Sequence, residues 1–193
     1  MDRRTLLANG LSAGLAPAIL KGAANAVRPN VVYLHSHDTG RYIQPYGHAV
    51  PTPNLQKFAS ESVLFRQAFD AAPTCSPSRA ALLTGMAPHS CGMFGLAHRG
   101  FSLNDPQQHL ANYLSRNGYE TALSGVQHET TAAKIPDLGY ARVLEAKGNR
   151  GPEVSAAAAR YLESRPKGPF FLACGFFETH REFPAPGPAE DPR

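Results

Sequence analysis

One segment of the sequence concentrates residues that could carry out nucleophilic and anion-binding chemistry. It reads Pro73-Thr74-Cys75-Ser76-Pro77-Ser78-Arg79 and is followed by Thr84-Gly85. Pro77 and Ser78 predict a helix that opens directly after Cys75, which would place this side chain beside unpaired backbone N–H groups and the positive end of the helix dipole. Arg79 adds a fixed positive charge and a planar fork of donors. The segment therefore predicts a reactive group beside a site that favours an anion.

Further polar side chains follow three predicted strands, at the point where each strand ends. They are His35, His37 and Asp38 after the strand predicted at 30–34, Gln127 and His128 after that at 119–124, and Glu178 and His180 after that at 169–177. Ligands of open parallel sheets bind outside the carboxyl ends of the strands, so these side chains would converge on one edge. Solvated loop residues would give the same pattern, because loops are generally polar.

The elements that must position these residues alternate between strands and helices. Apolar runs predict extended segments at 30–34, 63–69, 119–124 and 169–177, and helical spacing predicts helices at 53–60, 78–83, 105–117 and 153–164. This order indicates βαβ units and an α/β fold with a mostly parallel sheet flanked by helices. We expect His89, His98 and His109 to lie on the surface, and His35, Ser36, Arg41 and His48 to rim the pocket.

Composition and charge narrow the class of protein. The 193 residues suit one folded domain, which we expect over residues 27–182, with a Pro-rich loop at a truncation point over 183–193. Apolar residues at 42% and charged residues at 18% are ordinary for a folded soluble chain. The formal charge of +4 comes from scattered Lys and Arg, so we expect no nucleic-acid partner.

Residues 1–26 have the outline of an export signal. Arg3 and Arg4 precede an apolar stretch over 6–20, and Ala24-Asn25-Ala26 offers a cleavage site. The paired arginines favour a twin-arginine signal, and a short amphipathic leader that stays attached is the alternative. No other apolar run approaches the roughly 18 residues needed to cross a bilayer. We therefore expect a periplasmic or secreted protein with no membrane segment in its mature form.

The three cysteines are an odd number for an exported protein. At most one intramolecular disulfide can form, which would pair two cysteines and leave the third unpaired. Pairing of Cys91 with Cys174 and burial of both as small hydrophobic side chains remain open. Cys75 lies in a segment of specific residue types, so burial as a small hydrophobic side chain does not explain its presence there.

The segment around Cys75 resembles the sulfatase signature, in which Cys-x-Pro-Ser-Arg is followed by Thr-Gly. The likeness extends along nearly the whole mature chain and looks closest to the heparan N-sulfatase branch. It implies an alkaline phosphatase/sulfatase-like fold and a Cys75 that a formylglycine-generating enzyme oxidises to formylglycine. In this family one hydroxyl of the hydrated aldehyde attacks sulfur and displaces the alcohol. The second hydroxyl then loses its proton and sulfate is expelled, so one hard step becomes two easier ones.

The resemblance also implies a metal site. Paired aspartates end the first strand of the family and bind calcium together with the formylglycine at the position of Cys75. Here the corresponding residues are His37 and Asp38, so Asp38 carries over as a ligand and His37 departs from the pattern. Calcium prefers oxygen ligands, whereas imidazole nitrogen suits zinc and other transition metals. Ligation by His37, a lining role for His37, and a metal other than the expected calcium all remain open.

Two histidines carry over as catalytic residues. Gly125-Val126-Gln127-His128 resembles the family's Gly-Lys-x-His, in which the histidine acts near the formylglycine hydroxyl during elimination. Val126 replaces a sulfate-binding lysine, so another basic group or another geometry must bind sulfate. Glu178-Thr179-His180 resembles an Asp-Pro-His segment, which implies that His180 contacts sulfate or protonates the leaving oxygen. Glu178 either orients His180 or is a solvated loop carboxylate.

Together these features predict a hydrolase of sulfuric esters or sulfamates that acts on a sulfated small molecule or sugar. The family's two further metal ligands come from a later strand, so we expect an incomplete, amino-terminal fragment that is inactive alone. A phosphoester or phosphonate hydrolase of the same superfamily is one alternative. A noncatalytic sulfatase-like binding domain is the other.

Overall fold

The computed structural model describes residues 28–180. The predicted export signal over 1–26 and the Pro-rich loop over 183–193 lie outside these residues. The strands are β1 (Val31–His35), β2 (Glu120–Gly125), β3 (Arg142–Leu144) and β4 (Phe170–Gly175). The α-helices are α2 (Pro53–Ser60), α3 (Cys75–Thr84), α4 (Pro88–Cys91), α5 (Leu110–Arg116) and α6 (Gly151–Glu163). Short 3-10 helices are η1 (Gln44–Tyr46), η2 (Ala97–Arg99), η3 (Pro106–Gln108) and η4 (Ala132–Leu138).

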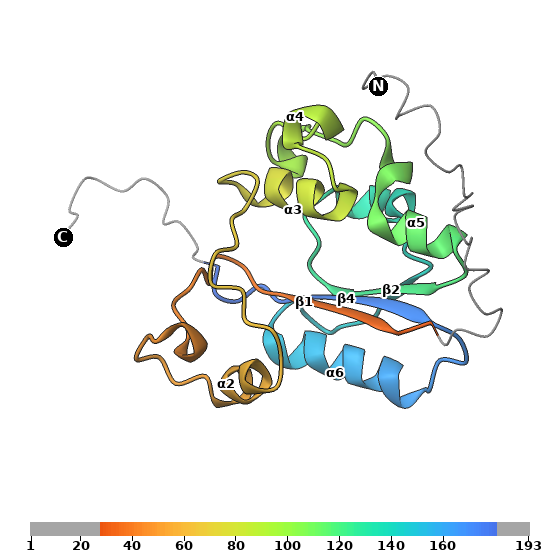
Figure 1. Cartoon of the computed structure of the whole chain (residues 1–193). Coiled ribbons are helices and arrows are strands. Elements are labelled where there is room, and N and C mark those ends of the chain that lie inside the picture. The colour runs from red at the N-terminus through yellow and green to blue at the C-terminus, as the bar shows by residue number, and fades with distance from the viewer. Residues whose placement is uncertain (1–27, 181–193) are drawn as a thin grey trace, which may run out of the picture.

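The four strands form one parallel sheet in the order β1-β4-β2-β3. The strand β4 lies in the interior of the sheet, and all six of its residues are buried. Helix α6 lies along one face of the sheet, and α3 and α5 cover the other (Figure 1). Coverage of both faces explains why β4 is a continuous apolar run without polar alternation. The predicted α/β fold, a parallel sheet flanked by helices, is confirmed.

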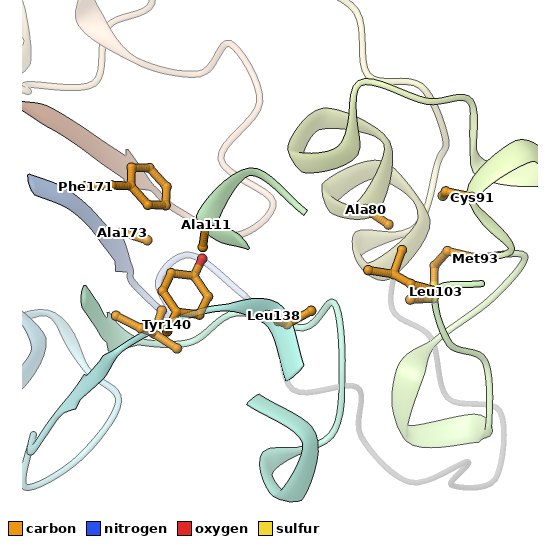
Figure 2. Close-up of a cluster of buried hydrophobic side chains, with 10 residues drawn as sticks. Ala80, Cys91, Met93, Leu103, Ala111, Leu138, Tyr140, Phe171 and Ala173 are labelled. Carbon is orange, nitrogen blue, oxygen red and sulfur yellow. The ribbon is translucent and has the colours of Figure 1, made fainter. Parts of the chain in front are cut away.

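Two hydrophobic clusters hold these layers together. The larger one joins the sheet to α3 and α5, and Figure 2 shows members from β4, the helices and the loops between them. Its buried members are Ala80, Cys91, Met93, Leu103, Ala111, Leu123, Leu138, Tyr140, Phe171 and Ala173. The smaller cluster lies on the α6 side of the sheet, where Leu172 and Cys174 pack with Ala158 and Tyr161. Cys91 and Cys174 are both buried and unbridged, so they act as small hydrophobic side chains here.

Most predicted elements are confirmed, and the differences have local causes. The helix expected over 105–117 is interrupted at His109, whose Nδ1 accepts a hydrogen bond from the Ala111 N–H at 3.2 Å and caps α5. The surface position predicted for His109 is therefore wrong: the ring is fully buried and packs edge-on against Tyr140. The segment 63–69 forms no strand and exposes Val63 and Phe65. The three-residue strand β3 was too short for its pattern to be detected.

Phe171 is the natural point at which to test this packing. We expect Phe171→Ala to lower the free energy of unfolding by about 3–5 kcal/mol, because the ring is 0% exposed and its removal leaves a cavity between β4 and Tyr140. Phe69→Ala is the matched control, since that ring is 89% exposed and its loss should change stability by less than about 0.5 kcal/mol. Chemical denaturation measures both, and equal effects would contradict the described core.

Candidate active site at the carboxyl edge of the sheet

Cys75 is the first residue of α3. Thr74 precedes it in an extended conformation, and its carbonyl accepts the first helical hydrogen bond from Ser78 N at 3.1 Å. Gly85 ends the helix in the left-handed conformation (φ 68°), which glycine adopts without steric cost. The sequence predicted a helix beginning at Ser78, and the observed start brings Cys75 itself into the first turn. The half-buried Cys75 side chain thus lies where N–H groups are unpaired within the helix.

Hydrogen bonds of the Arg79 side chain connect α3 to the end of β1. The residue is 9% exposed, and its guanidinium hydrogen-bonds through Nη1 to Nδ1 of His35 and donates through Nη2 to the Ser36 carbonyl at 3.3 Å. Burial, followed by the neighbouring Arg79 cation, lowers the pKa of His35 to about 3. His35 is therefore neutral at pH 7, and its Nδ1 accepts from Arg79. The cation one turn after Cys75 is held rigidly by these two bonds.

A cavity of about 650 Å³ brings several predicted site residues together. Its polar lining residues include His35, Ser36, Asp38, Asp70, Cys75 and Arg79. Asp70 was not predicted to be a site residue, and its only signal in the sequence is its place five residues before Cys75. Two of the four predicted rim residues do not line the cavity: Arg41 lies over the Tyr46 ring, and His48 packs against Tyr42.

Next to Arg79, three further histidines gather from three strand ends. The ring of His37 lies 4.8 Å from that of His128 and 5.6 Å from that of His180, measured between centroids. Backbone bonds hold the loops together, since His37 N donates to the Glu178 carbonyl and Thr179 N to the His37 carbonyl, each at 2.8 Å. The predicted convergence of β1, β2 and β4 on one edge is therefore observed.

Two of these imidazoles, those of His37 and His128, are neutral at pH 7. Burial, followed by repulsion from Arg79, lowers the pKa of His37 to about 4. The same two causes lower the pKa of His128. A neutral ring can accept as well as donate a proton, which suits the proton-transfer role predicted for His128.

Glu178 and Val126 lie in the loops that carry these histidines, and both make hydrogen bonds with the backbone of other segments. The Glu178 carboxylate accepts a hydrogen bond from the backbone N–H of Gly151 at 3.0 Å, which lowers its pKa and caps the start of α6. Its carboxylate is thus directed to the start of α6. Val126 donates its N–H to Gly175 at 2.9 Å and brings no charge to the site. Arg79 is therefore the buried cation that the described residues supply here.

Glu129 is an unexpected buried acid directly after His128. It is 1% exposed, Oε2 has no hydrogen-bond partner, and burial raises its pKa from 4.5 to about 8. Between these values the folded protein binds a proton that the unfolded chain has lost, so stability falls as pH rises. The loss is up to about 1.4 kcal/mol per pH unit, and it is complete above the folded pKa.

Glu129→Gln should remove this dependence. We expect the variant to gain stability over the natural chain at pH 8, with little gain at pH 5, because only ionised Glu129 is penalised. Urea denaturation at the two pH values measures the difference, with the exposed Glu163→Gln as the control. A gain that is the same at both pH values would contradict ionisation as its cause.

The donors present fit a metal ion only in part. Asp38 and Asp70 line the cavity with Cys75, and carboxylate oxygens suit a hard cation such as calcium. His37 is a nitrogen donor at the position where the resemblance places an oxygen donor. Among residues 28–180, no three His, Cys, Asp or Glu side chains are already arranged to hold a metal ion. The described residues therefore do not by themselves fit the six to eight oxygen ligands of calcium.

The structure combines a parallel α/β sheet with a potential nucleophile at a helix start, a buried arginine and converging histidines. This combination is typical of the active site of a hydrolase. The sulfatase family profile matches residues 29–192. This chain belongs to the sulfatase family.

Individual relatives agree with this assignment. Human N-sulphoglucosamine sulphohydrolase is 33% identical over 171 residues, which are 84% of this chain and 34% of that protein. The arylsulfatase of Klebsiella aerogenes is 31% identical over 137 residues, which cover 69% and 27% of the two chains. The chain therefore spans about a third of the length of these relatives.

Solved structures share the fold. One is the complex of a protein with its substrate D-glucosamine-2-N,6-O-disulfate, with a TM-score of 0.67 and 24% identity. The match covers 80% of this chain and 35% of that one. Within residues 28–180, no helix is long and apolar enough to span a membrane.

Proposed function

We propose that the complete gene product containing this chain hydrolyses sulfate esters or sulfamates. The observation that carries the proposal is the position of Cys75 at the start of α3, one turn from a buried Arg79 and in the same cavity as Asp38. Helix N–H groups and a guanidinium both favour a tetrahedral oxyanion. Membership of the sulfatase family supports sulfur as the reacting centre.

We further propose that Cys75 is converted to formylglycine by a separate maturation enzyme, as is general in the family. The hydrated aldehyde supplies a nucleophile that can be regenerated, which a plain thiol cannot. The cavity fits such a group because residue 75 is half-buried beside Arg79 and the Asp38 carboxylate. Arg79 then binds sulfate oxygens, and its bonds to His35 and Ser36 keep it oriented without reorganisation.

The histidines supply proton transfer in this proposal. His128 is close enough to Arg79 for that cation to lower its pKa, and it takes or returns the proton of the nucleophile. His180 donates to the leaving oxygen, since the loop after β4 carries it to the same edge as His37. Asp38 would be one ligand of a divalent cation, which would stabilise negative charge on the sulfate oxygens. Calcium is the ion that the resemblance implies.

The substrate is proposed to be a sulfated sugar. One relative is named for N-sulphoglucosamine, and one structural neighbour holds a glucosamine disulfate as its substrate. Export through residues 1–26 to the periplasm or medium would bring the enzyme to such substrates, and this location stays a prediction.

The proposal is tested with the complete gene product, coexpressed with a formylglycine-generating enzyme. Mass spectrometry of the peptide containing residue 75 should show formylglycine in place of the thiol. The same protein should hydrolyse 4-nitrophenyl sulfate or N-sulfated glucosamine at least about 100-fold faster than a matched phosphate ester. An unmodified thiol together with no turnover would support the noncatalytic binding domain, and faster phosphate hydrolysis would support the phosphoesterase.

A further inference from the structure

The cavity that contains Cys75, called the catalytic cavity below, continues into a second cavity along α3. The second cavity has a volume of about 610 Å³ and shares Asp70, Ser78 and Leu82 with the catalytic cavity. Cys75 and Leu82 are seven positions apart in α3, so they lie on the same side of the helix with about 10 Å of rise between them. A substrate whose sulfate lies beside Cys75 would therefore place its next chemical group in the second cavity.

The wall of the second cavity is mostly apolar and open to solvent. Phe69 is 89% exposed and Leu82 is 63% exposed, and both line this cavity. Exposed apolar side chains that gather beside a cavity are typical of ligand-binding surfaces. Asp70 is the one charged side chain among the described residues that line the second cavity, and no Lys, Arg or His is among them. The cavity therefore offers an aromatic ring, aliphatic contacts and one anionic acceptor, but no partner for an anion.

A neutral sugar unit matches this set of groups. The C–H faces of a sugar are apolar and pack on the face of an aromatic ring, while its hydroxyls donate hydrogen bonds to carboxylates. Phe69 supplies the ring, and Asp70, its neighbour in the chain, supplies the carboxylate. A sulfated or carboxylated sugar in this place would bring a second negative charge close to Asp70. An aryl group would use the apolar wall but would offer no donor to the carboxylate.

We propose that the second cavity is a subsite for a neutral sugar unit linked to the sulfated one, with Phe69 and Leu82 as its apolar wall and Asp70 as its acceptor. The inference deepens the proposed function and rests on it, because the sulfated unit lies in the catalytic cavity. Asp70 lines both cavities and so lies where the two sugar units meet. Phe69 lines the second cavity but not the catalytic one, so its substitution separates the subsite from catalysis.

Binding is measured by isothermal titration on the complete gene product carrying Cys75→Ala, so that sulfated ligands are not consumed. The ligands are N-sulfated glucosamine and its disaccharides with glucose or glucuronic acid, each linked through C1 or C4 of the sulfated unit. At least one glucose disaccharide should bind at least about 10-fold more tightly than the monosaccharide and than its glucuronic acid counterpart. Binding of the monosaccharide without a gain for either glucose disaccharide would overturn the subsite alone. No binding of any sulfated ligand would overturn the proposed function as well.

Variants of the subsite locate the gain. Phe69→Ala should weaken binding of the glucose disaccharide at least about 10-fold and change binding of the monosaccharide less than about 2-fold. Phe69→Tyr keeps the ring face and should retain the gain. Asp70→Asn removes the charge but keeps an acceptor oxygen, so it should narrow the difference between glucose and glucuronic acid to less than about 3-fold.

Phe94→Ala is the matched control for Phe69→Ala. The Phe94 ring is 67% exposed and lines neither cavity, so its loss should leave binding of every ligand unchanged. Unchanged affinity of Phe69→Ala for the glucose disaccharide would overturn the proposal. A large loss of stability in Phe69→Ala would overturn it too, because it would show that another segment of the complete protein covers the ring.

Discussion

Cys75→Ala in the complete gene product is expected to abolish sulfate ester hydrolysis, with kcat reduced by about 1,000-fold or more. The side chain at position 75 is the reactive group of the proposed mechanism, and methyl cannot be converted into an aldehyde. Loss of a covalent nucleophile typically costs this much because the barrier can no longer be split into two steps. The cavity and Arg79 remain, so binding of inorganic sulfate should change by less than about 10-fold.

Cys91→Ala is the matched control for this substitution. Cys91 is a buried and unbridged cysteine in the larger cluster, and it lies outside the cavity that contains Cys75. Its truncation should leave kcat unchanged and lower stability modestly, because a sulfur atom is lost from the core. Cys75→Ala should show the reverse pattern, with full stability and no turnover. Residual turnover above about 1% of the natural rate in Cys75→Ala would contradict nucleophilic catalysis at this position.

The parts of the site that could be predicted from sequence are those fixed by local chemistry. The residues after Cys75 specify a helix start, and Gly85 specifies its end, so the placement of Arg79 one turn along follows from helix geometry. Apolar runs identified β1, β2 and β4. The inner residues of β2 and all residues of β4 are buried on both faces of the sheet, where strands lack polar alternation. The parallel order then required the polar loops to meet at one edge.

The parts that could not be predicted depend on contacts between distant segments. Nothing in the local sequence around His37 indicates that Glu178 and Thr179 enclose it through backbone bonds. The burial of His109 follows from packing against Tyr140, thirty-one positions away. Asp70 enters the cavity because its loop folds back toward β1. Periodicity reports which face of an element is buried, and it does not report which partner covers that face.

Arg79 provides the second prediction with a large expected effect. Arg79→Met should lower kcat in the complete gene product by about 100- to 1,000-fold, because a preorganised cation beside developing negative charge is lost. Val126 offers no charge to replace it. The variant should also lose about 1–3 kcal/mol of stability, since His35 Nδ1 and the Ser36 carbonyl lose their donor. Steady-state kinetics and chemical denaturation measure the two effects.

Arg79→Lys separates charge from geometry at the same position. Lysine keeps the positive charge but cannot reach His35 and Ser36 with two nitrogens on one plane while also presenting donors to an oxyanion. We expect kcat to fall by at least about 10-fold, between the natural enzyme and Arg79→Met. Arg99→Met, at an exposed arginine of η2, controls for net charge and should leave kcat unchanged. Equal rates for Arg79→Lys and the natural enzyme would mean that charge alone suffices, and that the fixed link from β1 to α3 has no catalytic role.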